Sequence, residues 1–209
     1  MNKQALFTFV EFQCKRHNID DSHGLIHSRR CVEWVEKMFD SETDDEKIVA
    51  IYSTALHDLC DKKYSSAFES INELCTWLVE ENSFLCQEMI EAILSIIQTM
   101  SYSFLKQRRY EDGTNWYPDH GIWNRSYHLA RHADLLEGYH VGRCYMYTKH
   151  AFSHLNEEEV WERVEELFMK RMYHYVSDKW ITHPIALQYA PLLEDEARTC
   201  FITRVWEYK

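Results

Sequence analysis

Glycine and proline are scarce in this sequence, which has five glycines and three prolines in 209 residues. A sheet of many strands needs frequent turn residues, so this scarcity argues against a β-rich fold and favours helices. The seven cysteines are an odd number and none lies in a CxxC pair. Buried thiols in a reducing compartment explain them better than a disulfide framework does. The sequence therefore predicts an all-α protein with free cysteines.

The sequence also lacks any apolar run long enough to cross a membrane, and its first residues lack the apolar stretch of a signal peptide. The formal net charge of -11 argues against non-specific binding of nucleic acid, whose phosphates require a basic surface. We therefore expect a cytoplasmic protein that binds neither membrane nor nucleic acid, and the sequence predicts no particular oligomeric state. An anionic substrate would have to be bound by local cations or by a metal.

Apolar residues recur at helical spacing along most of the chain, whose length suits one domain with a substantial core. Asp21 and Ser22 are good N-cap residues for the second helix, and Asn156 for a later one. Residues 102–121 lose the periodicity, which predicts a long loop. We expect one domain over residues 1–209, with a motif-bearing core at about 21–154 and a helical tail at 156–209. The periodicity predicts helices at about 3–17, 22–38, 46–58, 66–80, 84–100, 124–137, 139–153 and from 157 onward. The stretch around His183-Pro184 breaks the pattern, and a last helix closes the chain through Phe201 and Trp206.

An adjacent pair, His57 and Asp58, ends the third predicted helix, where the spacing calls for an apolar residue. An ionised carboxylate in the core is costly unless a cation compensates it. Taken alone, the pair is better explained as a polar helix end or a core histidine with satisfied hydrogen bonds. A metal site becomes the better explanation once His27, on the inward face of the preceding helix, and Asp134, among apolar residues, are considered with the pair. Two histidines and two carboxylates on three helices predict a mixed nitrogen and oxygen site for a divalent ion.

Three strings, in this order, resemble the motifs of the HD-domain metal-dependent phosphohydrolases, and in particular their small stand-alone members. They are Asp21-Ser-His-Gly-Leu-Ile-His-Ser-Arg-Arg30, Leu56-His-Asp-Leu-Cys-Asp-Lys62 and Ala133-Asp-Leu-Leu-Glu-Gly-Tyr-His-Val-Gly-Arg143. The resemblance covers about residues 21–154. It implies a helical bundle that binds one divalent ion (Mn, Mg, Ni, Co, Zn or Fe) through His27, His57, Asp58 and Asp134. It also implies hydrolysis of a nucleotide or another small phosphate ester by metal-activated water.

Such a reaction needs a proton shuttle and a cation for the phosphate. Asp61, three residues after Asp58, is the candidate general acid or base, and Lys62 is the candidate phosphate contact. Each has a structural alternative, because Asp61 could cap the following helix and Lys62 could simply be solvated.

Further cations could complete a substrate-binding wall. Arg30, Arg131 and Arg143 are candidates, since arginine suits bidentate phosphate recognition, although each could equally form a surface salt bridge. His23 lies four residues before His27, and on the same helical face if the second helix begins early. We expect His23 to contact the substrate or support a ligand rather than to bind the metal itself.

The number of metal ions depends on further histidines. Family members with two metals carry them between the HD pair and the final aspartate, and the candidates here are His120, His128 and His132. Surface or packing roles suit these three histidines better, so we expect one metal.

Two other functions remain open. A catalytically silent module that binds a ligand or partner is the first alternative to a phosphohydrolase. The second is a diiron oxygenase on the same fold, which needs the larger histidine set.

Overall fold

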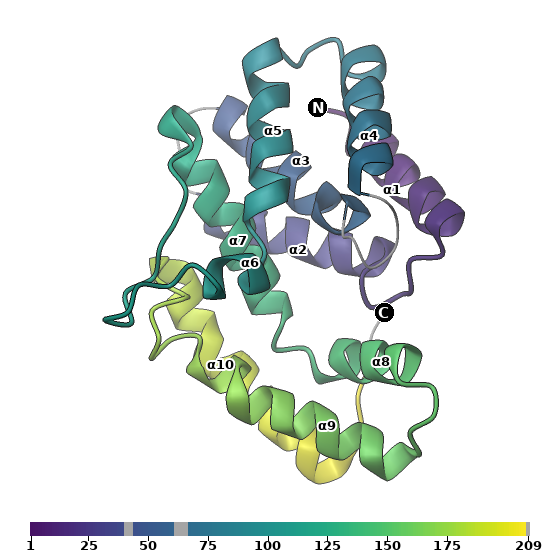
Figure 1. Ribbon diagram of the computed structural model, residues 1–209, viewed down its shortest axis with the longest axis vertical. Coiled ribbons are helices and arrows are strands. Elements are labelled where there is room, and N and C mark those ends of the chain that lie inside the picture. The colour runs from purple at the N-terminus through teal and green to yellow at the C-terminus, as the bar shows by residue number, and fades with distance from the viewer. Residues whose placement is uncertain (40–43, 61–66, 208–209) are drawn as a thin grey trace.

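The computed structural model describes residues 1–39, 44–60 and 67–207, and this part of the chain consists of helices joined by turns and loops (Figure 1). Helix accounts for 73% of the described residues and no strand occurs among them, so the predicted all-α class is confirmed. The α-helices of these residues are α1 (Lys3–His17), α2 (Leu25–Met38), α3 (Asp44–Leu56), α4 (Ala67–Glu81), α5 (Gln87–Thr99), α6 (Tyr102–Lys106), α7 (Asn124–Glu137), α8 (Val141–Ala151), α9 (Glu157–Lys170) and α10 (Pro184–Thr203). Three short 3₁₀ helices accompany them: η1 (His57–Cys60), η2 (Gly121–Trp123) and η3 (Met172–His174).

Helices α2, α3 and α7 pack against one another at the centre of the fold. Their facing side chains are fully buried, as Val35, Ile51 and Ala130 illustrate. Helix α5 packs on α3, and α1 covers α2 and α3. Burial of one large aliphatic side chain contributes about 1.5–3 kcal/mol, so these contacts hold the three central helices in a fixed arrangement. The three predicted motifs lie on or beside these central helices.

Helices α8, α9 and α10 form a second layer, seen below the central helices in Figure 1. Helix α8 packs on α9, and α10 contacts α2, α7 and α8. The ring centroid of Trp161 lies 4.8 Å from that of Tyr145, and Phe168 lies 5.0 Å from Phe201. Aromatic pairs at these separations add to the stabilisation from burial. This packing fixes α8, which contributes Arg143 to the candidate site.

Three predicted boundaries are wrong. Helix α2 begins at Leu25 after Gly24, and not after Asp21 or Ser22, because the Asp20 carboxylate accepts hydrogen bonds from the Ser22 amide and hydroxyl and holds residues 20–24 in a turn.

The predicted loop at 102–121 opens with the short helix α6, whose Phe104 amide donates to Ser101 Oγ at 3.3 Å. Helix α10 ends at Thr203 because Arg204 has a left-handed backbone, with φ of 57°. Trp206 therefore lies beyond the helix, and its ring packs against Gly142, where any larger residue would clash.

The predicted N-cap at Asn156 is confirmed. Its side chain accepts from the Glu159 amide at 3.1 Å, and the Glu159 carboxylate accepts from the Asn156 amide at 2.8 Å. We expect Asn156→Ala to lower the free energy of unfolding by about 1 kcal/mol, because the Glu159 amide in the first turn of α9 loses its side-chain acceptor. Chemical denaturation measures this change. Asn156→Asp keeps the acceptor and should stay near wild type, and equal losses in both variants would contradict the capping role.

Candidate metal centre

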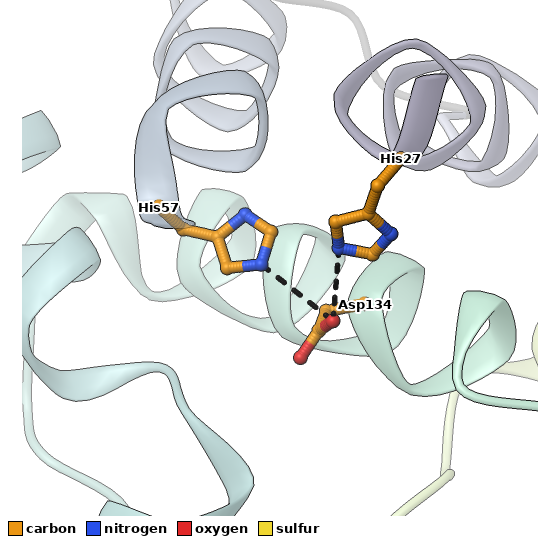
Figure 2. A group of neighbouring side chains, drawn as sticks. All are labelled: His27, His57 and Asp134. Carbon is orange, nitrogen blue, oxygen red and sulfur yellow. Dashed lines mark ion pairs between the residues drawn. The ribbon is translucent and has the colours of Figure 1, made fainter. Parts of the chain in front are cut away.

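The four predicted metal ligands converge where α2, η1 and α7 meet. His27 lies in the first turn of α2, His57 lies at the start of η1, and Asp134 lies in the second half of α7. The two imidazoles point at the same oxygen, as Figure 2 shows: Asp134 Oδ1 is 3.4 Å from His27 Nε2 and 3.6 Å from His57 Nε2. One ligand atom from each of the three residues lies within 4.8 Å of the others, which is a spacing that a single metal ion can bridge.

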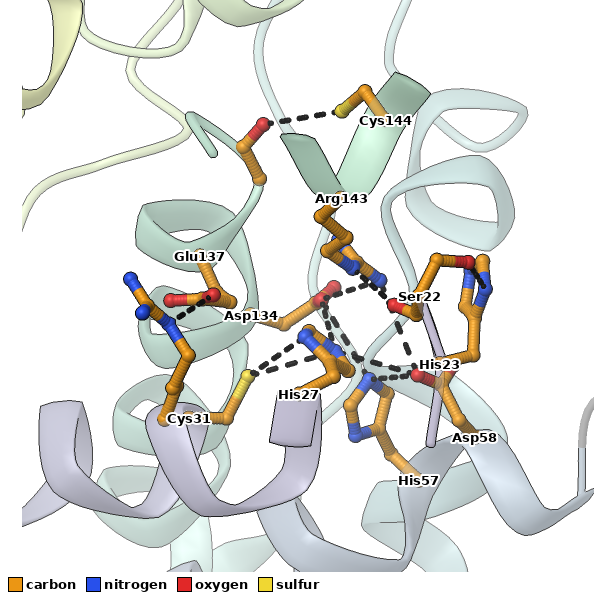
Figure 3. A network of polar contacts seen from close by, with 12 residues as sticks. Ser22, His23, His27, Cys31, His57, Asp58, Asp134, Glu137, Arg143 and Cys144 are labelled. Atoms are coloured by element: carbon orange, nitrogen blue, oxygen red, sulfur yellow. Dashed lines mark hydrogen bonds and ion pairs between the residues drawn. The ribbon is translucent and has the colours of Figure 1, made fainter. Parts of the chain in front are cut away.

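Asp58 lies beside this group, although it is not one of the three residues whose ligand atoms all lie within 4.8 Å of one another. Its Oδ2 lies 3.3 Å from His27 Nε2 and 3.4 Å from His57 Nε2 (Figure 3). The side chain is buried, and Oδ2 accepts no hydrogen bond within the described part of the chain. A buried carboxylate oxygen without a donor is costly unless a proton or a metal ion compensates it.

The hydrogen bond on the other side of the His57 ring decides which nitrogen faces the carboxylates. His57 Nδ1 lies 2.7 Å from the backbone oxygen of Thr54. Because a carbonyl oxygen can only accept, Nδ1 carries a hydrogen and donates it. In the neutral ring Nε2 then has a lone pair, which faces the oxygens of Asp58 and Asp134. The Nε2 lone pair and the carboxylate oxygens repel one another unless a positive charge lies between them. A hydrogen bond from the other ring nitrogen commonly orients metal-binding histidines in this way.

His27 has a different environment. It is fully buried, and the Cys31 thiol lies 3.5 Å from Nε2 and 3.6 Å from Nδ1. Burial, with the nearby positive charge of Arg143, lowers the pKa of His27 to about 3. The ring is therefore neutral at physiological pH, and a neutral imidazole is the form that binds metals.

The charges of the group favour a cation at its centre. Burial opposes ionisation of Asp58, but the neighbouring histidines, led by His57, lower its pKa overall. Burial likewise opposes ionisation of Asp134, but the neighbouring rings of His27 and His57 hold its pKa well below its ordinary value. Burial disfavours the charged form of His57, yet the two carboxylates raise its pKa to about 9. Both carboxylates are thus ionised, and they attract either a proton on His57 or a metal ion in its place.

Arg143 is the predicted substrate-binding arginine that the structure brings to this centre. Its Nε donates to the backbone oxygen of Ser22 at 2.7 Å, and its Nη2 lies 3.9 Å from Asp58 Oδ2 and from Asp134 Oδ1 (Figure 3). These last separations are longer than hydrogen bonds. The guanidinium therefore lies at the edge of the group, fixed by Ser22 and close enough to contact an anion bound there.

A pocket of about 270 Å³ opens onto the centre. His23 lines it, and its Nδ1 lies 2.7 Å from Ser22 Oγ while its ring meets the ring of Tyr147 edge-on at 5.0 Å. The other walls include Arg143 of α8, Tyr102 of α6, and Arg171 just after α9. The sequence analysis expected His23 on the helix that carries His27, but His23 lies in the turn before α2, and its side chain lines this pocket from there. A pocket of this size suits a small molecule.

Two of the predicted arginines lie elsewhere. Arg30 Nε donates to Glu137 Oε1 at 2.7 Å, and Arg30 lines a separate cavity of about 250 Å³. Arg131 is 2% exposed, and its Nη1 donates to the backbone oxygen of Trp180 at 2.5 Å while its guanidinium lies 4.5 Å from the Tyr117 ring. Neither side chain lines the pocket beside the metal ligands.

The two predicted catalytic residues, Asp61 and Lys62, lie outside the described residues.

The three additional histidines lie outside the His27, His57 and Asp134 group. His132 is buried, and its Nε2 accepts from the Thr182 amide at 3.1 Å. His128 and His120 contact the Tyr127 ring at 5.0 Å and 4.7 Å. Among the residues that the structure describes, one group of histidine and acidic side chains has metal-binding spacing.

The sequence did not identify several of the residues that line this pocket. Tyr102 and the flanking serines fell in a segment predicted as a loop, and Arg171 follows a helix whose pattern indicated only core packing. No motif marks these positions. Their position depends on the packing of α9 on α8 and on the contact between Arg171 and Tyr102 of α6, which periodicity does not reveal.

No family model, curated protein or solved structure matches this chain. The resemblance to HD-domain proteins therefore depends on the three motifs. Among the described helices, none has both the length and the apolar character that crossing a bilayer demands. All seven cysteines are free thiols, and Cys14, Cys31 and Cys144 are buried.

Proposed function

We propose that this protein is a metal-dependent phosphohydrolase of the HD-domain type, which hydrolyses a nucleotide or another small phosphate ester. The observation that carries the proposal is Asp58 Oδ2, a buried carboxylate oxygen without a hydrogen bond that faces two imidazole nitrogens at 3.3 Å and 3.4 Å. One divalent ion would compensate this oxygen and use both nitrogen lone pairs. The combination of imidazole and carboxylate suits Mn, Fe, Co, Ni or Zn, and Mg is a further candidate.

His27, His57, Asp58 and Asp134 would hold this ion, which supplies a Lewis acid and an activated water nucleophile. Arg143 is placed to contact the oxygens of the phosphate as negative charge develops on them, and the Ser22 carbonyl fixes its orientation before substrate arrives. His23, oriented by Ser22 Oγ, lines the same pocket and can donate to the substrate. Asp61 and Lys62 remain our candidates for proton transfer and for a second phosphate contact.

The proposed partner is a small phosphorylated metabolite, with one metal ion per chain. The pocket of about 270 Å³ is consistent with a small ligand, and the net charge of -11 argues against nucleic acid. We place the protein in the cytoplasm, because seven free cysteines suit a reducing compartment.

Two alternatives have less support. A silent binding module gains nothing from Asp58 and Asp134, whose burial beside two histidines costs stability in the absence of a ligand. A diiron oxygenase needs a second set of ligands, and the described residues contain one group with suitable spacing.

Metal removal tests the proposal directly. We expect protein treated with a chelator to release no phosphate from a panel of nucleotides and sugar phosphates, and added Mn, Mg, Ni or Co to restore release from one substrate class. Released phosphate is measured colorimetrically, and bound metal by elemental analysis. Protein that holds one metal per chain and hydrolyses nothing in the panel would favour the binding module. Two irons per chain with oxygen consumption would favour the oxygenase.

A further inference from the structure

Arg171 has an unusual position among the arginines of this chain. It lines the pocket beside the metal centre, and its guanidinium lies 4.0 Å from the Tyr102 ring and 5.6 Å from the Tyr175 ring. Its buried Nε has no hydrogen-bond acceptor in the described part of the chain. Contacts with ring faces favour the positive charge, but they leave the N–H donors of the side chain unused.

Several other arginines of this chain have acidic partners. Arg16, Arg30, Arg109, Arg198 and Arg204 each form an ion pair with a glutamate or aspartate. The chain carries 34 acidic residues against 23 basic ones, so a carboxylate partner is easy to supply. Among the described residues, Arg171 has neither an ion pair nor a side-chain hydrogen bond. A buried donor without an acceptor is destabilising, and a bound anion would supply the acceptor.

The surroundings of Arg171 hold it ready for such an anion. Two aromatic rings limit the conformations of its side chain, so little entropy is lost when the guanidinium binds. Arg143 and Arg171 both act electrostatically on the thiol of Cys144, which also lines the pocket. The pocket therefore has one cation beside the metal ligands and a second on the wall formed by α6 and the end of α9.

We propose that Arg171 binds a second phosphate of the substrate, and hence that the substrate carries at least two phosphates, as a nucleoside diphosphate or triphosphate does. This inference rests on the proposed function: the metal ligands and Arg143 bind the phosphate that reacts, and Arg171 binds its neighbour in the chain. The planar guanidinium matches a phosphate with two parallel hydrogen bonds. The hydroxyls of Ser101 and Ser103, on the same pocket wall, can donate to the remaining oxygens.

Binding of inorganic phosphates tests this subsite without requiring turnover. Pyrophosphate and orthophosphate are titrated calorimetrically into wild type, Arg171→Gln and Arg171→Lys, both metal-free and with one equivalent of Mn. Arg163→Gln is the matched control, because Arg163 is an exposed arginine of α9 that lies over the Phe152 ring. Circular dichroism and thermal melting establish that each variant is folded.

We expect wild type to bind pyrophosphate about tenfold more tightly than orthophosphate, and Arg171→Gln to lose that preference, because the charged hydrogen bonds from the guanidinium to the second phosphate are lost. Arg171→Lys should retain part of the preference, and Arg163→Gln all of it. The proposal is overturned if wild type shows no preference in either metal state, or if Arg171→Gln keeps the preference.

The two proposals can fail separately. Arg171-dependent pyrophosphate binding without any phosphate release would refute the phosphohydrolase and leave the anion subsite standing. Metal-dependent release from monophosphates, at equal kcat/KM in wild type and Arg171→Gln and without a pyrophosphate preference, would refute the subsite and leave the hydrolase standing.

Discussion

Asp58→Ala is expected to abolish phosphate release while the helical fold survives. Asp58 Oδ2 lies 3.3 Å and 3.4 Å from the two imidazole nitrogens, so its loss removes one ligand of the proposed metal and the negative charge that attracts the ion. We expect kcat/KM to fall by more than about 1000-fold, which corresponds to about 4 kcal/mol of transition-state stabilisation. The measurement is phosphate release with saturating metal on the best substrate of the panel.

The fold should tolerate this change, because Asp58 Oδ2 accepts no hydrogen bond within the described residues and the truncation leaves the packing of Leu56 and Leu59 intact. Asp178→Ala is the matched control. Asp178 pairs with Arg109 at 3.4 Å and does not line the pocket, so its variant should keep wild-type activity. Unchanged activity in Asp58→Ala, or a loss of activity that parallels a loss of helicity, would contradict the assigned role.

Metal binding should also raise the stability of the protein, and Asp134→Asn should remove that effect. Asp134 Oδ1 contacts both imidazole nitrogens, and an amide at this position is a neutral and much weaker ligand. At a free metal concentration 100 times the Kd, we expect the free energy of unfolding to rise by about 2.7 kcal/mol. For a chain of 209 residues, this corresponds to an increase in Tm of about 5–11 °C.

Differential scanning calorimetry with and without Mn measures this shift in wild type and in Asp134→Asn. Asp195→Asn is the control, because Asp195 is an exposed residue of α10 away from the pocket, and its variant should show the wild-type shift. An equal shift in Asp134→Asn would mean that the stabilising ion binds elsewhere. A shift in wild type without phosphate release would confirm a metal site and refute the proposed chemistry.

The helices were largely predictable because their information is local. The apolar spacing around Ile93 and Ile97 in α5, or Val160 and Val164 in α9, follows the helical period and needs no knowledge of the partners. Asn156 was recognised as an N-cap because its acceptor reaches an amide three residues away. Prediction was wrong where a local turn competed with the helix, as at Asp20 and Ser22, whose hydrogen bonds delay the start of α2.

The metal site was predictable only in part. The sequence placed His27 and Asp134 on inward helical faces and His57 and Asp58 at the end of another helix, and a polar group at a core position is itself a signal. The contact of all four depends on the close packing of α2, α3 and α7. Sequence reasoning therefore found the candidates, and the structure supplied the distances of 3.3–3.6 Å between them.

The sequence by itself determined the all-helical class, the excess of negative charge and the set of candidate ligands, because composition and helical period act over a few residues. Only the tertiary structure decided which cations face the pocket. Arg131 and Arg143 look equally suitable in the sequence, yet Arg131 is buried against the Trp180 segment and Arg143 reaches the carboxylates. Arg171, which no motif marks, lines the pocket because α9 ends beside α6. Long side chains can point in several directions from one backbone position, so the packing of distant helices determines where their charges lie.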